Sequence, residues 1–470
     1  MGGSTTAPTR STAWWLPAAA GRRPRPLGVT AAPDTDELST LLDRGPVHNL
    51  RRLSGGASRQ MWSFVAGDRR MVLRRDPPGA PSTVGMEREA GLLRAARAAG
   101  MAVPDVLLAK PSYLVMSWLD GETLPRRILR DARFADARQR LLQQCAQQLA
   151  LLHTRVSVSR VEGRPVRDPL VNVTNRLDKT GEPHPAFELA LRWLAINRPE
   201  PVASAVLHGD FRLDNLMVDE TGLVAVLDWE LAHVGDPVQD LAWLCVRSWR
   251  FGSPLPAAGL GTREQLVEAY TAAGGAPVDA SALHWWEVFC TLNWGVMCVE
   301  QARAHLTGGV RSVELAAVGR RACEVELDVL DLLPVEWETK DAPVPGGAPP
   351  SDLHDRPSAA ELLEAVREFL ASLDLTGHDA FLRKVSDRVL RVVEREMSLG
   401  PVLDREHVDR LAGLGVADTQ ELATLIRMHR VAPASVATAI RAAVVAKLHV
   451  VDPAQLHDRC SLDPGRVAGR

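Results

Sequence analysis

The segment Ala205–Val218, AVLHGDFRLDNLMV, decides how the rest of the chain is interpreted. It begins with an apolar run, becomes polar at His208, and is apolar again from Leu216. Two short apolar runs on either side of a polar loop are typical of β-strands that hold a site between them. Histidine, aspartate, arginine and asparagine crowd this loop, and such side chains can bind phosphate and metal. The alternative interpretation is a solvated loop.

The spacing of these polar residues suits phosphoryl transfer. That reaction requires a carboxylate near the acceptor hydroxyl, oxygen ligands for Mg²⁺, and positive groups on the phosphates. Asp210 stands at a predicted strand end, Asn215 offers an amide oxygen, and the stretch VAVLDWE places Asp228 at the end of the next strand. Because a hairpin brings its strand ends together, Asn215 and Asp228 can reach one metal ion, and Mg²⁺ prefers such hard oxygen ligands.

Composition limits the classes of function. The chain has 470 residues, 46% of them hydrophobic, and this length favours two domains. The net charge of −3 and the pI of about 6.5 give no overall basic field, so no nucleic acid partner is expected. The six cysteines form no C-x-x-C pair and most lie in apolar runs, which predicts buried free thiols and a cytoplasmic location. We find no apolar run long enough to cross a bilayer, so no membrane partner is expected.

The pattern of the sequence changes several times along the chain. Residues 1–33 are predicted to be a disordered tail. Residues 34–119 predict a strand-rich lobe with one helix, and residues 120–339 a mainly helical lobe. Residues 340–356 are rich in proline and glycine and predict a linker. Residues 357–470 have the apolar spacing of a separate helical domain. The predicted fold class is α+β, with two lobes and a small all-α C-terminal domain.

Local signals predict individual elements. Gly67 and Asp68 are expected to form the turn of a β-hairpin. Asp236 is a candidate N-cap for a helix with Pro237 at its first position. Apolar spacing predicts one continuous helix over Ser312–Leu333.

Three motifs then indicate a family. HGDFRLDN, His208–Asn215, resembles the catalytic loop of aminoglycoside phosphotransferase-like kinases, relatives of the protein kinases, whose loop reads HRDLxxxN. LDWE at 227–230 resembles this family's version of DFG, and GDPVQDLAW at 235–243 resembles the helix that follows. The motifs occur in the correct order after a strand-rich lobe, and the resemblance covers roughly residues 47–335. It implies a bilobal protein-kinase-like fold and an ATP- and Mg²⁺-dependent phosphotransferase that acts on a small-molecule hydroxyl.

The resemblance also implies a role for each polar residue of the loop. Asp210 would be the catalytic base or would orient the acceptor hydroxyl. Arg212 would either neutralise phosphate charge or contact solvent. His208 would brace the loop, and Asp240 would support it through hydrogen bonds or serve as a favourable charge at a helix N-terminus. The implied metal ligands are Asn215 and Asp228.

The first lobe would supply the nucleotide site. In LSGGASRQMWSF, the pair Gly55 and Gly56 allows a close approach of backbone to phosphate, and Ser58 lies in the same nucleotide-covering loop. An ordinary turn is the alternative. LVMSWLDGETL resembles the hinge, whose backbone would face the adenine or simply connect the lobes; its residues are Ser117, Trp118 and Leu119.

The third predicted strand departs from the kinase pattern. Kinases place a lysine here, as in VAIK, whereas this sequence reads MVLRR and has Arg74 at the matching position. An arginine can bind phosphates, although its planar fork differs from a lysine point charge. Glu89 would be its ion-pair partner, with Glu87 as the competitor, and Arg75 should point to the other side of the strand. The substitution also raises the hypothesis of an ATP-binding pseudokinase with a scaffolding role.

The acceptor is less well defined. Trp285, Trp286 and Trp294 have helical spacing, which favours a core role, although a choline-like cation could use such rings as a cage. A narrower resemblance rests on VLRRDPPG, MEREAGLL and NWGVMCVEQARAHLTG together with the catalytic motifs. It is to kinase domains fused to, or encoded beside, acyl-CoA dehydrogenases. This resemblance implies a hydroxyacyl-CoA-type acceptor and an acyl-CoA dehydrogenase pathway partner.

A second enzyme hypothesis is a kinase for an aminoglycoside, a macrolide or a choline-like compound. A cationic aminoglycoside would favour an acidic pocket, whereas the region around Arg303, Arg311, Arg320 and Arg321 has mixed charge. The C-terminal helical region resembles a small uncharacterised domain found with bacterial members of the branch.

Overall fold

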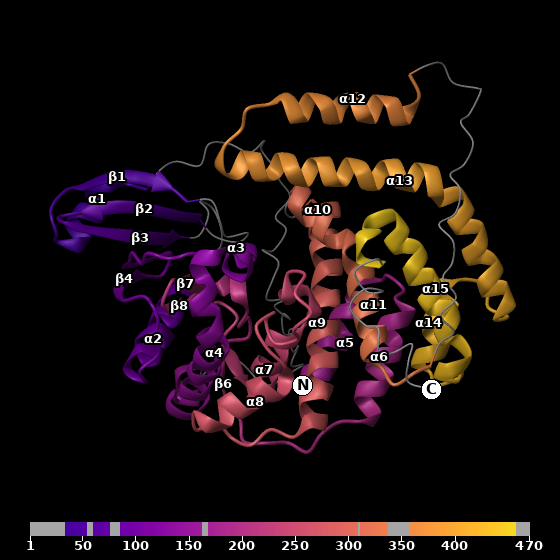
Figure 1. Cartoon of the computed structure of the whole chain (residues 1–470), viewed down its shortest axis with the longest axis horizontal. Helices are drawn as coiled ribbons and strands as arrows, with labels where there is room; N and C mark the ends of the chain where they lie inside the picture. Colours follow the sequence, from indigo (N-terminus) through magenta and orange to yellow (C-terminus); the bar gives the residue numbers. More distant parts are fainter. Residues whose placement is uncertain are drawn as a thin grey trace, which may run out of the picture.

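The computed structural model describes residues 33–53, 60–75, 85–161, 168–308, 311–336 and 357–456. Within these ranges the chain forms a strand-rich lobe, a mainly helical lobe and a group of C-terminal helices (Figure 1). The predicted α+β class is confirmed. Nearly all of the predicted tail, the glycine pair and the predicted linker lie outside the described residues.

The first lobe is built on a five-stranded antiparallel sheet with the order β1-β2-β3-β5-β4. The register between β2 and β3 pairs Ala66 with Arg69, so Gly67 and Asp68 form the predicted hairpin turn. Gly67 has φ +61°, a left-handed conformation that glycine adopts readily. The strands are β1 (Val47–Arg52), β2 (Gln60–Ala66), β3 (Arg69–Arg75), β4 (Val106–Lys110) and β5 (Tyr113–Ser117).

Alternation along β3 decides which of its side chains face the site. Met71 and Leu73 belong to a small core on one face of the sheet, beneath α1 (Thr35–Leu42). Val72 packs on the opposite face with the buried residues of α2 (Gly85–Ala98). Because successive side chains of a strand alternate, Arg74 lies on the same side as Val72 and α2.

The second lobe surrounds a long central helix, α9 (Ala280–Leu306), which is buried along most of its length. Trp285, Trp286 and Trp294 are 2%, 5% and 8% exposed, so the prediction that they belong to the core is confirmed. The other helices of this lobe include α3 (Pro125–Arg130), α4 (Ala135–Arg155), α5 (Pro169–Thr180), α6 (Pro185–Ile196), α7 (Val238–Cys245) and α8 (Arg263–Ala272).

Two local predictions were wrong in detail. The helix predicted over Ser312–Leu333 is two helices, α10 (Val313–Arg320) and α11 (Ala322–Leu332), which meet at Arg321. Helix α7 begins at Val238, one residue later than predicted. One difference is a break inside the predicted helix, and the other is a shift of a helix start. Apolar periodicity does not determine the residues at which a helix begins or ends.

The C-terminal helices pack against the second lobe. They are α12 (Ala359–Ser372), α13 (Gly377–Gly413), α14 (Thr419–Arg427) and α15 (Pro433–Val451). Figure 1 shows α12 and α13 running side by side, and α14 and α15 lying beside α6 and α11. Ion pairs cross this boundary, including Arg427 to Glu188 and Lys447 to Glu326 at 2.5 and 2.9 Å.

One described helix, α15, is apolar and long enough to cross a membrane when judged by length and composition alone. The expectation that the chain holds no such run was therefore wrong. Helix α15 packs against α11 and α13, and its buried side chains include Ile440, Val444 and Leu448. A core helix with this packing passes the same test of composition.

The five cysteines within the described ranges are buried free thiols, as predicted, and burial raises the pKa of Cys145 to about 12. Cys460 lies outside those ranges.

Candidate active site

The opening segment folds as two strands around a polar loop. Strand β6 (Ala205–Leu207) pairs with β9 (His233–Gly235), and β7 (Leu216–Asp219) pairs with β8 (Gly222–Val226). The Leu227 amide donates to the Asn215 carbonyl at 2.8 Å and extends this second hairpin. Asn215 and Asp228 therefore emerge at the same end, as the sequence predicted.

Gly209 lets the chain turn inside the loop. Its φ is +78°, and a Cβ there would lie 2.6 Å from the Leu231 carbonyl oxygen. Any side chain at this position would collide with backbone as well as strain its own φ, so glycine is required sterically.

Asp240 anchors the backbone of the loop from α7. Its two oxygens accept from the amides of His208 and Gly209 at 2.7 and 2.9 Å, and the carboxylate is fully buried. Burial alone would raise the pKa of Asp240, but hydrogen bonds led by that of His153, 3.3 Å away, lower it. The supporting hydrogen bonds expected of Asp240 are present. His153 in α4 has no counterpart in the motifs, and sequence reasoning missed it.

His208 is fixed in one tautomer. Its Nε2 lies 2.9 Å from the Leu227 carbonyl oxygen and must donate to it, so Nδ1 accepts the Asp210 amide at 3.2 Å. The ring therefore links the loop to the end of the next hairpin, which is the bracing position expected from the sequence.

Three donors converge on the Asp210 carboxylate. Arg212 Nε and Trp243 Nε1 donate to Oδ1 at 2.8 and 2.9 Å, and Asn215 Nδ2 donates to Oδ2 at 2.8 Å. This network holds the carboxylate in one orientation. Trp243 was not predicted as a site residue, although it ends the quoted motif GDPVQDLAW and lies one helical turn after Asp240.

The interpretation of Arg212 was incomplete. Its guanidinium is held by Asp210 and by Asp214, the latter at 2.6 Å, and stacks 4.3 Å from the Trp249 ring centroid, which the sequence did not predict. A role towards phosphate stays a prediction. Burial would lower the pKa of Arg212, but the neighbouring carboxylates raise it. A fixed positive charge thus stands beside Asp210.

Arg74 is the centre of a buried ion-pair network. Its Nη1 lies 2.5 Å from Glu89 Oε1, and its Nη2 lies 2.7 Å from Asp228 Oδ1 and 3.0 Å from Glu230 Oε2. Burial would lower the pKa of Arg74, yet the three carboxylates raise it. The predicted contact with Glu89 is present, whereas Glu87 is exposed. Glu230 is a further member of the network that sequence reasoning missed.

Asp228 and Asn215 have oxygens suited to a metal ion. The Asp228 side chain is 38% exposed, and its backbone has φ +58°, a conformation that is uncommon outside glycine and often marks a functional site. The Asn215 amide nitrogen donates to Asp210, while its Oδ1 accepts no hydrogen bond from the described part of the chain. One carboxylate and one amide oxygen fit Mg²⁺, which takes its other ligands from phosphates and water. No group of three or more His, Cys, Asp or Glu suited to a metal occurs among the described residues.

The predicted hinge has fewer backbone N–H groups available to an adenine than expected. The Ser117 amide donates to the Asp105 carbonyl and the Trp118 amide to the Arg70 carbonyl, at 3.0 and 3.2 Å. The Trp118 ring lies 3.4 Å under the Arg70 guanidinium. Among the described residues no acceptor is bonded to the Leu119 amide, which remains available for an adenine edge. Gly55, Gly56 and Ser58 lie outside the described residues.

The two lobes, with Arg74 and Glu89 in one and the braced loop of Asp210 in the other, define a small-molecule kinase that phosphorylates a hydroxyl group. Residues 49–284, half of the chain, match the model of the phosphotransferase enzyme family. The chain belongs to this family. Residues 374–455 match a domain of unknown function, DUF6285.

Individual proteins resemble parts of the chain. Mouse acyl-CoA dehydrogenase family member 10 is 30% identical over 253 residues, which are 47% of this chain and 23% of that protein. Human acyl-CoA dehydrogenase family member 11 is 26% identical over 278 residues, 54% of this chain and 35% of that protein. The chain thus spans about a quarter to a third of the length of these curated relatives.

A solved structure shows the same fold. The "putative aminoglycoside phosphotransferase" from Ralstonia eutropha is 20% identical, with a TM-score of 0.52, and covers 64% of this chain and 98% of its own. The predicted bilobal kinase-like fold is confirmed.

Proposed function

We propose that this phosphotransferase uses ATP and Mg²⁺ to phosphorylate the hydroxyl group of a hydroxyacyl-CoA-type metabolite. The observation that carries the kinase chemistry is that Asp210, Asn215 and Asp228 converge at one end of the β7–β8 hairpin. Arg74, which pairs with Glu89, also contacts Asp228 there. Phosphoryl transfer depends almost entirely on positioning and charge, and these side chains supply both.

Each residue has a distinct part in this proposal. Asp210 orients the acceptor hydroxyl and accepts its proton, because three donors fix the position of its carboxylate. Asn215 and Asp228 hold Mg²⁺, which would neutralise charge on the phosphates. Arg74 clamps the phosphates in place of the usual lysine, and the Leu119 amide contacts the adenine.

The names of the acyl-CoA dehydrogenase family members that the chain resembles are consistent with an acyl-CoA acceptor. The proposal also includes a partner in an acyl-CoA dehydrogenase pathway, and a cytoplasmic location that rests on the cysteine pattern of the sequence. An aminoglycoside, a macrolide or a choline-like compound is the alternative acceptor. The core position of the three tryptophans of α9 gives no support to a choline cage. The pseudokinase hypothesis has little support, since Asp210, Asn215 and Asp228 are all retained.

A direct assay tests the proposal. The wild-type chain is incubated with ATP and Mg²⁺ and a panel of hydroxyacyl-CoAs, aminoglycosides, macrolides and choline, and ADP release is measured. We expect ADP release with hydroxyacyl-CoAs, its loss in Asp210→Asn with ATP binding retained, and no change in Asp219→Asn, a matched control in the β7–β8 turn. Release with another acceptor class would replace the substrate assignment, and binding of ATP without turnover on any acceptor would establish the pseudokinase.

A further inference from the structure

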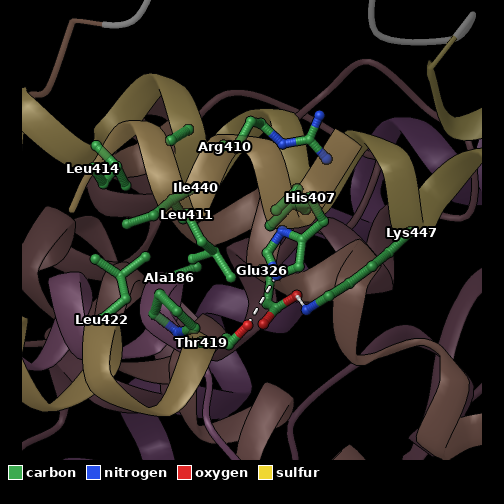
Figure 2. Close-up of a pocket in the computed structure, with 14 residues that line it drawn as sticks. Ala186, Glu326, His407, Arg410, Leu411, Leu414, Thr419, Leu422, Ile440 and Lys447 are labelled. Carbon is green, nitrogen blue, oxygen red and sulfur yellow. Dashed lines mark hydrogen bonds and ion pairs between the residues drawn. The ribbon is translucent and has the colours of Figure 1, made fainter. Parts of the chain in front are cut away.

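A small cavity lies between the kinase-like second lobe and the C-terminal helices. Its volume is about 60 Å³, and it is lined by residues of α6, α11, α13, α14 and α15. Figure 2 shows that one side of the cavity is apolar, with Leu411, Leu414 and Ile440, and that the other side carries Arg410 and His407. The cavity is therefore amphipathic and is built by both parts of the chain.

Arg410 brings an unused hydrogen-bonding edge to this cavity. Its Nη1 lies 3.5 Å from Glu406 Oε2, on an exposed side chain, but its Nε and Nη2 are buried and have no partner. Nε and Nη2 form one edge of the planar guanidinium, the fork that binds both oxygens of a carboxylate. Buried donors are normally satisfied, and leaving a charged group's donors without acceptors is costly. This edge therefore indicates a missing anionic acceptor.

His407 offers a second unused polar atom beside Arg410. It precedes Arg410 by three residues on α13, which places both on one face of the helix. Its Nε2 lies 2.9 Å from Thr419 Oγ1, and its Nδ1 is buried without a partner. Burial, aided by the charges of Arg410 and Lys447, lowers the pKa of His407, so the ring is neutral. When Thr419 donates to Nε2, the neutral ring carries its proton on Nδ1 and is a donor.

The one buried carboxylate that lines the cavity does not pair with Arg410. Glu326 accepts from His184 Nδ1 at 2.8 Å and from Lys447 Nζ at 2.9 Å, and Arg410 Nε and Nη2 make no hydrogen bond to it. The polar end of the cavity therefore keeps buried donors without acceptors.

We propose that this cavity binds a small carboxylate of two or three carbons, with its oxygens on the Arg410 Nε–Nη2 edge and its apolar carbons against Leu411, Leu414 and Ile440. The size follows from the volume, which exceeds what one water molecule requires and is well below the roughly 150 Å³ that accommodates benzene. Ala186 of α6 and Glu326 of α11 also line the cavity, so the bound anion lies at the boundary between the second lobe and the C-terminal helices. The site is separate from the phosphotransfer centre and is suited to an effector.

Titration calorimetry of the full chain with sodium propionate, at an ionic strength held constant with sodium chloride, tests the proposal. We expect saturable binding to the wild type, at least a tenfold weaker affinity in Arg410→Met, and unchanged affinity in Arg405→Met, an exposed arginine of the same helix. Arg410→Lys should also bind weakly, since lysine lacks the fork.

The melting temperature separates this site from a structural arginine. Without ligand, Arg410→Met should melt at or above the wild-type temperature, because it removes buried donors without partners. Absence of propionate binding to the wild type, equal affinity in Arg410→Met, or tighter binding of inorganic phosphate than of propionate would overturn the proposal. A lower melting temperature of both Arg410 variants, without loss of affinity, would assign Arg410 a structural role instead.

Discussion

Replacing Arg74 should separate its structural role from its role towards phosphate. Arg74→Met keeps an unbranched apolar stem but removes the charge that faces Glu89, Asp228 and Glu230. The pair with Glu89 is the most buried of the three contacts, with side chains 9% and 4% exposed. We therefore expect a large loss of stability from this pair and a smaller one from the two more exposed carboxylates, which water can solvate.

The size of the effect follows from this burial. Removing one partner of a buried ion pair costs about 3–5 kcal/mol, because the remaining charge stays in a poorly solvated place. For lobes of this size, each kcal/mol of lost stability lowers the melting temperature by about 2 °C, so this temperature should fall by roughly 6–10 °C. Loss of a charge-assisted contact to phosphate, worth about 1.5–3 kcal/mol, should weaken ATP binding roughly 10- to 100-fold.

A double variant distinguishes the two roles. Arg74→Met combined with Glu89→Met replaces the buried pair by apolar side chains and should recover most of the melting temperature, but not the affinity for ATP. Arg75→Met is the matched control, since Arg75 lies on the other face of β3 and contacts Gln60 at 3.0 Å. Melting is followed by calorimetry, and ATP affinity by titration. The reasoning is refuted if Arg74→Met melts no lower than Arg75→Met, or if ATP affinity recovers together with stability.

Two further variants test other parts of the structure. Trp243→Phe removes one donor from Asp210 Oδ1 and should lower kcat about tenfold, the value of one hydrogen bond to a charged group, while KM for ATP stays unchanged; a fall in ATP affinity alone would contradict this. For Glu326, burial opposes ionisation, but Lys447 and His184 lower its pKa from 4.5 to about 2. A lowered pKa stabilises the fold above the unfolded value, so this contribution is complete above pH 4.5 and is lost as the pH falls towards about 2. The difference in urea midpoint between wild type and Glu326→Gln should therefore shrink across this range, and a constant difference would disprove the assignment.

The sequence predicted correctly the positions of those site residues that lie close together in the chain. Asp210, Asn215 and Asp228 lie close together in the chain, around the single hairpin β7–β8, so the motif spacing alone placed them together. Strand alternation separated Arg74 from Arg75, because the period of two is a property of the backbone.

The missed residues come from parts of the fold whose positions motifs do not determine. His153 reaches Asp240 from α4, 87 residues away in the chain, and no periodicity encodes that contact. Trp243 was visible in a quoted motif, but an apolar helix face predicts burial and not an indole N–H directed at Asp210. For Arg212, the sequence left two possible contacts, phosphate or solvent. Its observed partner Trp249 could not be predicted, because this residue follows a helix whose path the sequence does not fix.

The Arg74 network also explains how an arginine can replace a lysine and what nucleotide binding would require. Arg74 Nη2 carries two hydrogens, and the contacts to Asp228 and Glu230 use both of them. A phosphate oxygen can therefore reach Nη2 only if one carboxylate leaves. The side chain of Asp228 is 38% exposed and that of Glu230 is 20% exposed, so displacing Asp228 breaks the less buried of the two ion pairs. Asp228 is also the proposed metal ligand, so its departure from Arg74 would leave Oδ1 for Mg²⁺ and would free a donor for phosphate. A lysine ammonium has three donors and no planar fork, and could not hold Glu89, Asp228 and Glu230 in this geometry while keeping a donor for phosphate. In the proposed mechanism, the arginine would thus couple the contacts of Asp228 to the binding of phosphate.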